Sequence, residues 1–155
     1  MHWHAYTWIG NGADRARESE RRPDWPGFAT GTLPPMRTGD WLAKASSQVA
    51  ASFDDVDRAV KWLAERYSHV EQQFLYPDRV GLEDRISSAK DLLPRHIDVM
   101  WGWWLKGGRF ASLAMVCCPN RDVDHPCPER RGDDRYRNRP QRSGLQAGGE
   151  ADRPA

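Results

Sequence analysis

The chain of 155 residues lacks a long apolar stretch, an excess of charge of either sign and a large number of cysteines. Its longest largely apolar stretches, 99–105 and 110–118, fall far short of the roughly 18 residues that a membrane helix needs, so we predict no membrane segment. The first eight residues contain no basic start followed by a plain apolar stretch, which argues against a secretory signal. We therefore expect a small soluble protein located in the cytoplasm.

The balance of charge limits the classes of partner. Lysine and arginine together number 23 and aspartate and glutamate 22, so the chain has no one-signed field that would attract nucleic acid or an anionic membrane. The sequence also contains no Gly-x-Gly-x-x-Gly, P-loop, Gly-x-Ser-x-Gly or His-Glu-x-x-His motif. These absences favour a protein without enzymatic activity.

Tryptophan is the residue that the chain has in excess. Its eight tryptophans occur at positions 3, 8, 25, 41, 62, 101, 103 and 104. Large aromatic rings usually lie in protein cores or interfaces, so this tryptophan-rich composition indicates aromatic packing within the protein or against a partner.

Composition divides the chain into three parts. Residues 1–40 are rich in proline and glycine and predict an irregular segment, in which His2–Ile9 is the one candidate for an edge strand. Residues 41–118 hold nearly all of the periodic apolar residues and predict a compact α+β core. Residues 119–155 have too few apolar side chains to offset the loss of chain entropy on folding, so we expect a disordered polar tail.

Two apolar repeats inside the core have helical spacing. The first consists of seven residues spaced alternately three and four apart: Phe53, Val56, Val60, Leu63, Tyr67, Val70 and Phe74. This spacing predicts a helix over 53–75 with one apolar face and with Ser52 as its capping residue. The second repeat, from Leu82 to Leu93, stops at Pro94 and predicts a shorter helix that covers part of that face.

After these helices the pattern changes to that of a β-hairpin. Two segments rich in tryptophan, valine and methionine flank Gly107 and Gly108, which can supply the positive φ angles of a two-residue turn. With that turn, Trp103 would face Ser112. Both faces of the hairpin are apolar, so each needs a cover. The helices can cover one face, while the other needs the N-terminal segment, a partner chain or a ligand.

Together these elements predict an α+β fold in which two helices pack on a small antiparallel sheet built round the hairpin. An isolated hairpin is only marginally stable, so a third strand is expected, and His2–Ile9 is the segment that can supply it. The predicted order is therefore β-α-α-β-β.

A cluster of metal-binding residue types follows the hairpin. Cys118, His125 and Cys127 offer the thiolates and imidazole that tetrahedral zinc prefers. Their spacing matches no standard zinc pattern. We therefore favour reduced thiols without a ligand role, and a protein without a cofactor. Zinc binding is the alternative. His2 and His4 would point to the same side of a strand, as paired ligands sometimes do, but such a pair at a chain terminus also arises by chance.

Asp98 is the best single candidate for acid–base chemistry. The predicted hairpin places its carboxyl group on a largely apolar face opposite Cys117, where burial would raise the pKa of the carboxyl group. A carboxylate at a strand end that bonds a backbone amide or Arg95 is the favoured alternative, because many perturbed acids are structural.

These observations support two functional hypotheses. The leading one is a non-enzymatic module that binds a protein partner or a second copy of itself through Trp101, Trp103 and Trp104. The alternative is a small enzyme or ligand-binding protein with a pocket around Asp98 and Trp101. An open cleft beside Asp98 would favour the alternative.

Overall fold

The computed structural model describes residues 1–130. The strands are β1 (His2–Asn11), β2 (Ala51–Phe53), β3 (Val99–Leu105) and β4 (Arg109–Cys118), and the helices are α1 (Val56–Val70) and α2 (Leu82–Leu92). Six short 3₁₀ helices accompany them: η1 (Gly12–Ala16), η2 (Glu18–Arg21), η3 (Thr38–Ala43), η4 (Ser46–Gln48), η5 (Glu71–Gln73) and η6 (Leu93–Arg95). None of the helices within residues 1–130 is long and apolar enough to cross a membrane.

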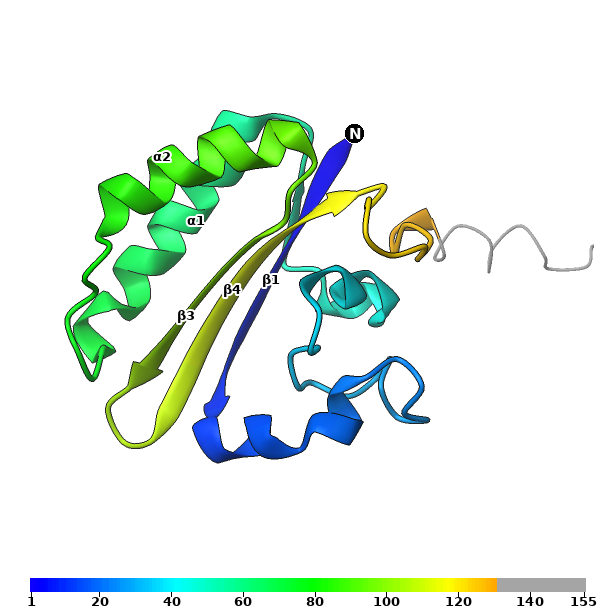
Figure 1. The fold of residues 1–155 in the computed structure, drawn as a ribbon, viewed down its shortest axis with the longest axis horizontal. Coiled ribbons are helices and arrows are strands. Elements are labelled where there is room, and N and C mark those ends of the chain that lie inside the picture. The colour runs from blue at the N-terminus through cyan, green and yellow to red at the C-terminus, as the bar shows by residue number, and fades with distance from the viewer. Residues whose placement is uncertain (131–155) are drawn as a thin grey trace, which may run out of the picture.

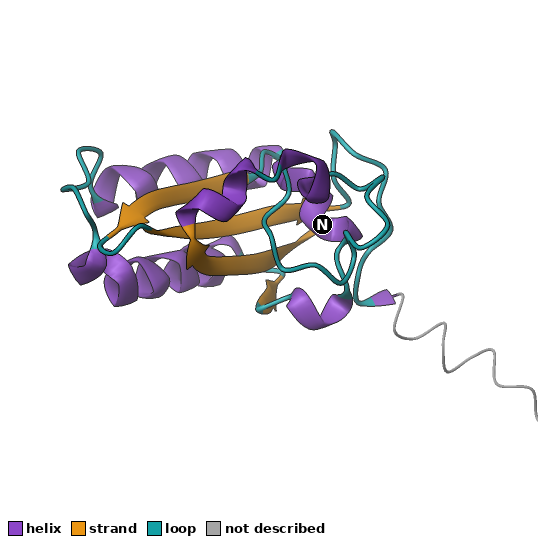
Figure 2. Cartoon of the chain, turned by 90° about the horizontal axis from the view of Figure 1, so that it is seen from below, coloured by secondary structure: helices purple, strands orange, loops and turns teal. Residues whose placement is uncertain are grey.

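The four strands form one antiparallel sheet in the order β2-β1-β4-β3. The helices α1 and α2 lie along one side of this sheet, and the segment between β1 and β2 lies on the other side (Figure 1). Seen from below, the strands lie side by side with helical segments on either side of them (Figure 2). The expected α+β fold, with two helices packed on an antiparallel sheet, is therefore confirmed.

The first strand is longer and more central than the sequence predicted. All ten residues of β1 pair with β4, and three of them also pair with β2 on the other side. This placement corrects the expectation that His2–Ile9 forms an edge strand. The reason lies in its side chains: Trp3 and Ala5 are buried toward the helices, while Tyr6 is buried on the opposite face. A strand covered on both faces suits the interior of a sheet.

Helix α1 begins later than predicted. Residues 51–53 pair with β1 as a strand, so Ser52 cannot cap the helix. The cap is Asp55 instead, whose Oδ1 accepts a hydrogen bond of 2.8 Å from the backbone N–H of Arg58. Five of the seven residues of the predicted stripe are nevertheless buried in the core between the helices and the sheet, and Phe53 and Val56 are partly buried against it.

The hairpin is correct in position but wrong in register by one residue. Trp103 pairs with Ala111 instead of Ser112, because Lys106, Gly107 and Gly108 form a three-residue connection. Both glycines adopt positive φ angles, 80° and 71°. Since side chains alternate across a strand, this slip exchanges the two faces of β4 relative to those of β3.

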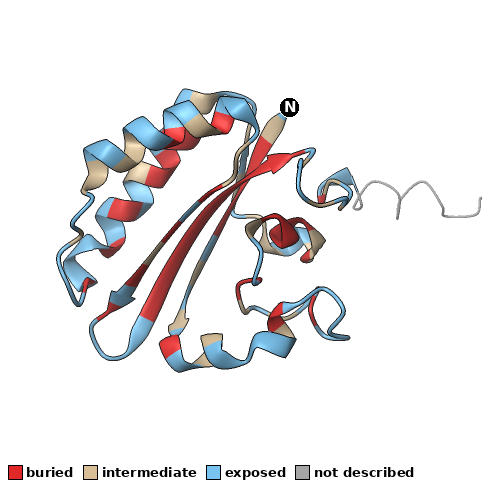
Figure 3. Ribbon diagram, viewed as in Figure 1, coloured by how far each residue is buried: buried red, intermediate tan, exposed pale blue. Residues whose placement is uncertain are grey.

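The sheet carries a core on each face. Helices α1 and α2 cover one face, which includes Trp101, Trp103 and Cys117. On the other face the Trp41 ring stacks on Tyr6 with a centroid distance of 4.8 Å. The central strands are therefore buried over most of their length (Figure 3). The segment between β1 and β2, which includes Trp41, thus provides a cover for the second face. Of the three alternatives that the sequence left open, this is closest to a cover by the N-terminal segment.

The expected disordered tail divides into two stretches. Residues 131–155 lie outside the described residues. Residues 119–130 return to the sheet, where Cys127 packs against the core that contains Tyr6 and Pro128 is fully buried. The expectation of disorder is therefore corrected for residues 119–130, which belong to the folded protein.

Candidate metal centre

Four residues that metal ions favour as ligands meet at one end of the sheet. His2 and His4 lie on β1 two residues apart, so their side chains point to the same face. Cys118 ends β4 and pairs with His2 in the strand register. Cys127 arrives from the segment that follows β4. The structure thus joins two residues from the start of the chain to two residues more than a hundred positions later.

The distances among these side chains fit a tetrahedral ion. Nε2 of His2 lies 3.0 Å from Nε2 of His4, and the Cys127 Sγ lies 3.5 Å and 3.4 Å from these two nitrogens. One ligand atom from each of the four residues lies within 4.8 Å of all the others. Bond lengths of about 2.0–2.1 Å to nitrogen and about 2.3 Å to sulfur place tetrahedral ligands about 3.3–3.8 Å apart. The three separations among His2, His4 and Cys127 lie close to this range, and all four ligand atoms lie within 4.8 Å of one another.

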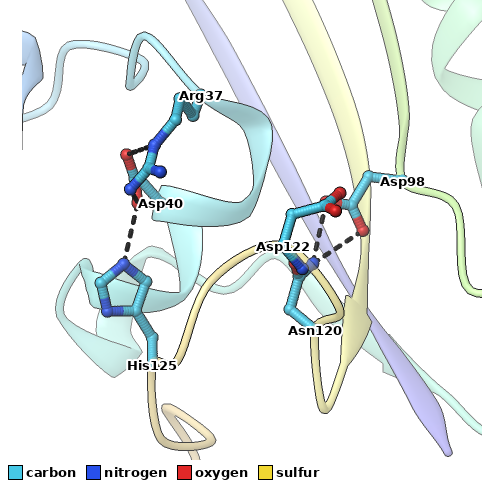
Figure 4. A network of polar contacts seen from close by, with 6 residues as sticks. All are labelled: Arg37, Asp40, Asp98, Asn120, Asp122 and His125. Atoms are coloured by element: carbon cyan, nitrogen blue, oxygen red, sulfur yellow. Dashed lines mark hydrogen bonds and ion pairs between the residues drawn. The ribbon is translucent and has the colours of Figure 1, made fainter.

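A loop after β4 brings Cys127 back to the sheet, and Asp98 anchors its start. Asp98 Oδ1 accepts a hydrogen bond of 2.8 Å from the backbone N–H of Cys117. The Asn120 side-chain amide donates to both oxygens of the same carboxylate, at 3.0 Å and 2.9 Å (Figure 4). Burial raises the pKa of Asp98, although these hydrogen bonds act in the opposite direction. Asp98 therefore bonds a backbone amide, as the favoured sequence interpretation proposed.

His125 anchors the same loop closer to Cys127. Its Nε2 lies 2.8 Å from Oδ1 of Asp40, which also accepts a hydrogen bond from Arg37 (Figure 4). His125 does not belong to the ligand cluster. The structure brings Cys118 and Cys127 together, as the sequence grouping placed them, but the histidines beside them are His2 and His4 and not His125.

A second layer of polar groups supports His4. Its Nδ1, which points away from the cluster, lies 2.8 Å from the Ser52 hydroxyl, and that hydroxyl lies 2.5 Å from Oε1 of Glu129. Metal-binding histidines usually bond such a partner through their second ring nitrogen, because the partner fixes the orientation of the ring. β2 is the element that supplies Ser52 at this point.

Burial controls the protonation of the cluster. His4 is fully buried, and burial, with a smaller contribution from His2, lowers the pKa of His4 to about 4. The imidazole is therefore neutral near pH 7, as a metal ligand must be. Burial and the neighbouring Cys127 raise the pKa of Cys118 to about 12. A bound cation would supply the positive charge that a thiolate at this position needs.

The cluster is reachable from solvent on one side. A cavity of about 470 Å³ is lined by His2, Ser52, Cys127 and Glu129, together with three further residues. His2 and Cys127 are only partly buried, whereas His4 and Cys118 form the buried side of the cluster. A metal ion therefore has an entry path that requires no opening of the core.

The tryptophans proposed as interaction residues fall on different faces. Trp101 and Trp103 are buried beneath the helices, where their rings surround Tyr67. Trp104 points to the opposite face and remains 44% exposed. Of the three, only Trp104 presents a large apolar surface.

The sequence contains one signal for the two histidines of the cluster, but that signal is not sufficient by itself. A His-x-His pair in a strand predicts a shared face, but nothing in the sequence indicates that residues 2 and 118 become partners in the sheet.

Comparison with protein-family models, with curated proteins and with solved structures finds no match.

Proposed function

We propose that this protein binds one zinc ion through His2, His4, Cys118 and Cys127, and that it is a non-enzymatic module stabilised by that ion. The observation that carries the proposal is the meeting of four ligand atoms within 4.8 Å. Two thiolates and two imidazoles favour Zn²⁺ over Mg²⁺ and Ca²⁺, which prefer oxygen ligands.

The number of ligands supports a structural role. Catalytic zinc usually has three protein ligands and a bound water, whereas four protein ligands complete the tetrahedron. The ion would tie the start of β1 to the end of β4 and to the segment around Cys127. Each of these connections joins parts of the chain that lie far apart in sequence, so binding would stabilise the folded state directly.

The proposal is tested by metal content and by spectroscopy on the full chain. Protein purified without chelator and then dialysed should contain one zinc per chain by inductively coupled plasma mass spectrometry. Replacement by Co²⁺ should produce a thiolate-to-cobalt charge-transfer band and the intense visible bands of a tetrahedral site.

Cys117 and His125 provide matched controls. Cys118→Ser and His2→Asn should each abolish stoichiometric zinc, because each removes a ligand. Cys117→Ser alters the neighbouring thiol that faces the helices, and His125→Asn alters the histidine bound to Asp40. Both controls should keep one zinc. Loss of zinc from the controls but not from the ligand variants would overturn the assignment, as would wild-type protein that binds neither metal.

Partner binding is a second candidate function, with a second copy of this chain as the partner. The observation that favours it is the edge strand β3, whose residues Val99–Leu105 include no charge and no proline, the features that usually protect an edge. The Trp104 carbonyl accepts a bond of 2.9 Å from Leu75, on the side away from β4. In a strand, the backbone N–H and C=O groups of every second residue point to the same side. Those of Met100 and Gly102 therefore also point away from β4.

A two-fold axis at Trp101 would place Met100 opposite Gly102 of the second copy and allow four backbone hydrogen bonds between the strands. Sedimentation should then show a concentration-dependent dimer. Met100→Lys should give a monomer, while Val80→Lys, at a residue exposed to a similar extent, should leave the dimer intact. A wild-type monomer at high micromolar concentration would remove this second candidate.

The cytoplasm is the location that we propose for a protein of this kind. A site with two thiolate ligands requires an environment in which thiols stay reduced, and the cytoplasm is such an environment.

A further inference from the structure

A cavity separate from the metal centre lies at the opposite end of the sheet, on the face away from α1 and α2. Its volume is about 630 Å³, within the range typical of small-molecule sites. Met100, Trp104 and Phe110 from the hairpin line one side, and residues from η1, η2 and the segment before η3 line the other. It is called the Arg15 cavity below.

Apolar surface is concentrated in the Arg15 cavity. Met36, Met100 and Trp104 are 38%, 53% and 44% exposed, and all three line it. The Trp104 ring is held in place, because it packs edge-on against Phe110 and lies directly over Gly12, where a Cβ atom would lie within 1.9 Å of the ring. A rigid aromatic wall beside two flexible methionines suits a flat apolar ligand.

A buried cation holds the walls of the cavity together. The Arg21 side chain is 9% exposed, and its guanidinium donates to the backbone carbonyls of Arg15 and Pro34 at 2.6 Å and 2.7 Å. These bonds join η1 to the segment that leads to η3. None of the ion pairs among residues 1–130 involves Arg21. Backbone carbonyls accept hydrogen bonds from its guanidinium, Glu18 favours its charge at longer range, and Arg15 opposes it.

Arg15 supplies a second cation at the cavity surface. Its guanidinium lies over the Phe110 ring, with Cζ 3.7 Å from the ring centroid. None of the ion pairs among the described residues involves Arg15. A guanidinium has five N–H donors, and contact with a ring does not use them as hydrogen-bond donors to an oxygen acceptor, so they can bind an anion. Glu18 is the one acid in the lining, and its carboxylate lies 4.0 Å from Arg22.

We propose that the Arg15 cavity binds a small aromatic carboxylate. The aromatic body would lie against Trp104, Met36 and Met100, and the carboxylate would accept two parallel hydrogen bonds from Arg15. The positive charge of Arg21 favours an anion over a neutral ligand of the same shape. This site does not depend on the metal, since its lining shares no residue with the zinc cluster.

The test uses the full chain with zinc bound and compares 2-naphthoate with its neutral analogue 2-naphthamide by isothermal titration calorimetry. Naphthoate should bind about tenfold or more tightly than naphthamide, because only the carboxylate forms the paired bonds to Arg15. Arg15→Gln should remove this preference. Arg17→Gln is the matched control, since Arg17 lies two residues away and pairs with Asp14 and Glu20.

Nuclear magnetic resonance tests whether naphthoate binds beside Trp104. In ¹H–¹⁵N spectra, naphthoate should shift the indole N–H signal of Trp104, assigned by its loss in Trp104→Phe, and should leave that of Trp62 unchanged. Failure of naphthoate to bind below millimolar concentration would overturn the proposal. Equal binding of the two probes, or equal losses in the Arg15 and Arg17 variants, would also overturn it.

Discussion

His4 and Ser52 are joined by a hydrogen bond of 2.8 Å between the imidazole Nδ1 and the serine Oγ. The serine hydroxyl has one proton, and the neighbouring Glu129 carboxylate, 2.5 Å away, can only accept it. Ser52 must therefore accept from His4, which puts the imidazole proton on Nδ1. The other nitrogen, Nε2, is then unprotonated and faces His2 and Cys127, as zinc coordination requires.

Loss of the Ser52 hydroxyl should weaken zinc binding without removing a ligand. Ser52→Ala leaves the His4 Nδ1–H without its acceptor, and changes of this kind typically reduce metal affinity about 10–100-fold. Competition with a chromophoric chelator should show this loss at an unchanged stoichiometry of one zinc. Ser88→Ala, on the exposed side of α2, is the control and should match wild type. An unchanged affinity in Ser52→Ala would show that the ring is oriented by other contacts.

Asp78 should make the protein sensitive to acid. Its carboxylate accepts bonds of 2.7 Å and 2.9 Å from the Arg85 guanidinium and one of 3.1 Å from the Tyr67 hydroxyl. The Arg85 bonds are the largest cause that lowers the pKa of Asp78 from 3.8 to about 2. A lowered pKa in the folded state stabilises the fold above pH 4, and that stabilisation is lost as the pH falls from about 4 toward 2.

Urea unfolding at several pH values measures this contribution. At pH 6, Asp78→Asn should be less stable than wild type by about 3 kcal/mol, because Arg85 loses its partner in a largely buried position. The difference should shrink as the pH approaches 2, where wild type also loses the charge. The exposed Asp84→Asn, next to Arg85 on α2, should change little at any pH. A gap between wild type and Asp78→Asn that stays constant with pH would contradict the assigned cause.

Local patterns predicted the elements of this fold better than their arrangement. The spacing around Leu63 and Ile86 identified both helices, because apolar periodicity is a local property. The interior position of β1 was missed, because pairing with β4 joins residues about a hundred positions apart and leaves no local trace. The short strand β2 was missed for a similar reason: Ser52 reads as a helix cap until β1 is placed beside it.

In the candidate site too, residues close in sequence could be grouped in advance, whereas residues brought together by the fold could not. Cys118 and Cys127 could be proposed together because they are close in sequence, and His125 was joined to them on the same ground. The structure separates His125, since its partner Asp40 comes from a distant 3₁₀ helix. His2 and His4 enter the cluster only through the β1–β4 register. The proposed ligand set is therefore a consequence of the topology and not of the local spacing.

Substitution of Gly108 tests whether the hairpin connection requires the positive φ angle of this residue. Gly108 has a φ angle of 71°, a region that costs most L-residues about 1–2 kcal/mol. Gly108→Ala should lower the free energy of unfolding by about 1 kcal/mol, and Gly108→Asn by less, because asparagine tolerates this region. Thermal melts of the two variants provide the comparison. Equal stability of Gly108→Ala and wild type would show that the turn can adopt another geometry.

The limits of the folding unit give the last prediction. The sequence placed the compact core at 41–118, but a fragment with those bounds lacks β1, which separates β2 from β4 in the sheet. Removing β1 would expose the edge of β4 and leave the cores on both faces without Trp3 and Tyr6. It would also remove two zinc ligands. We therefore expect fragment 41–118 to lack a cooperative thermal transition, with or without added zinc.

A chain that ends at Arg130 should behave differently. It retains every strand and helix of the described fold, all four zinc ligands and Glu129, so it should melt cooperatively near the temperature of the full chain and bind one zinc. A chain that ends at Cys118 isolates the contribution of the loop, because it keeps the sheet but loses Cys127 and the contact between His125 and Asp40. That chain should bind zinc weakly and melt at a lower temperature. If fragment 41–118 folds cooperatively by itself, or if the chains that end at 118 and 130 bind zinc equally well, β1 and Cys127 do not have the roles assigned to them.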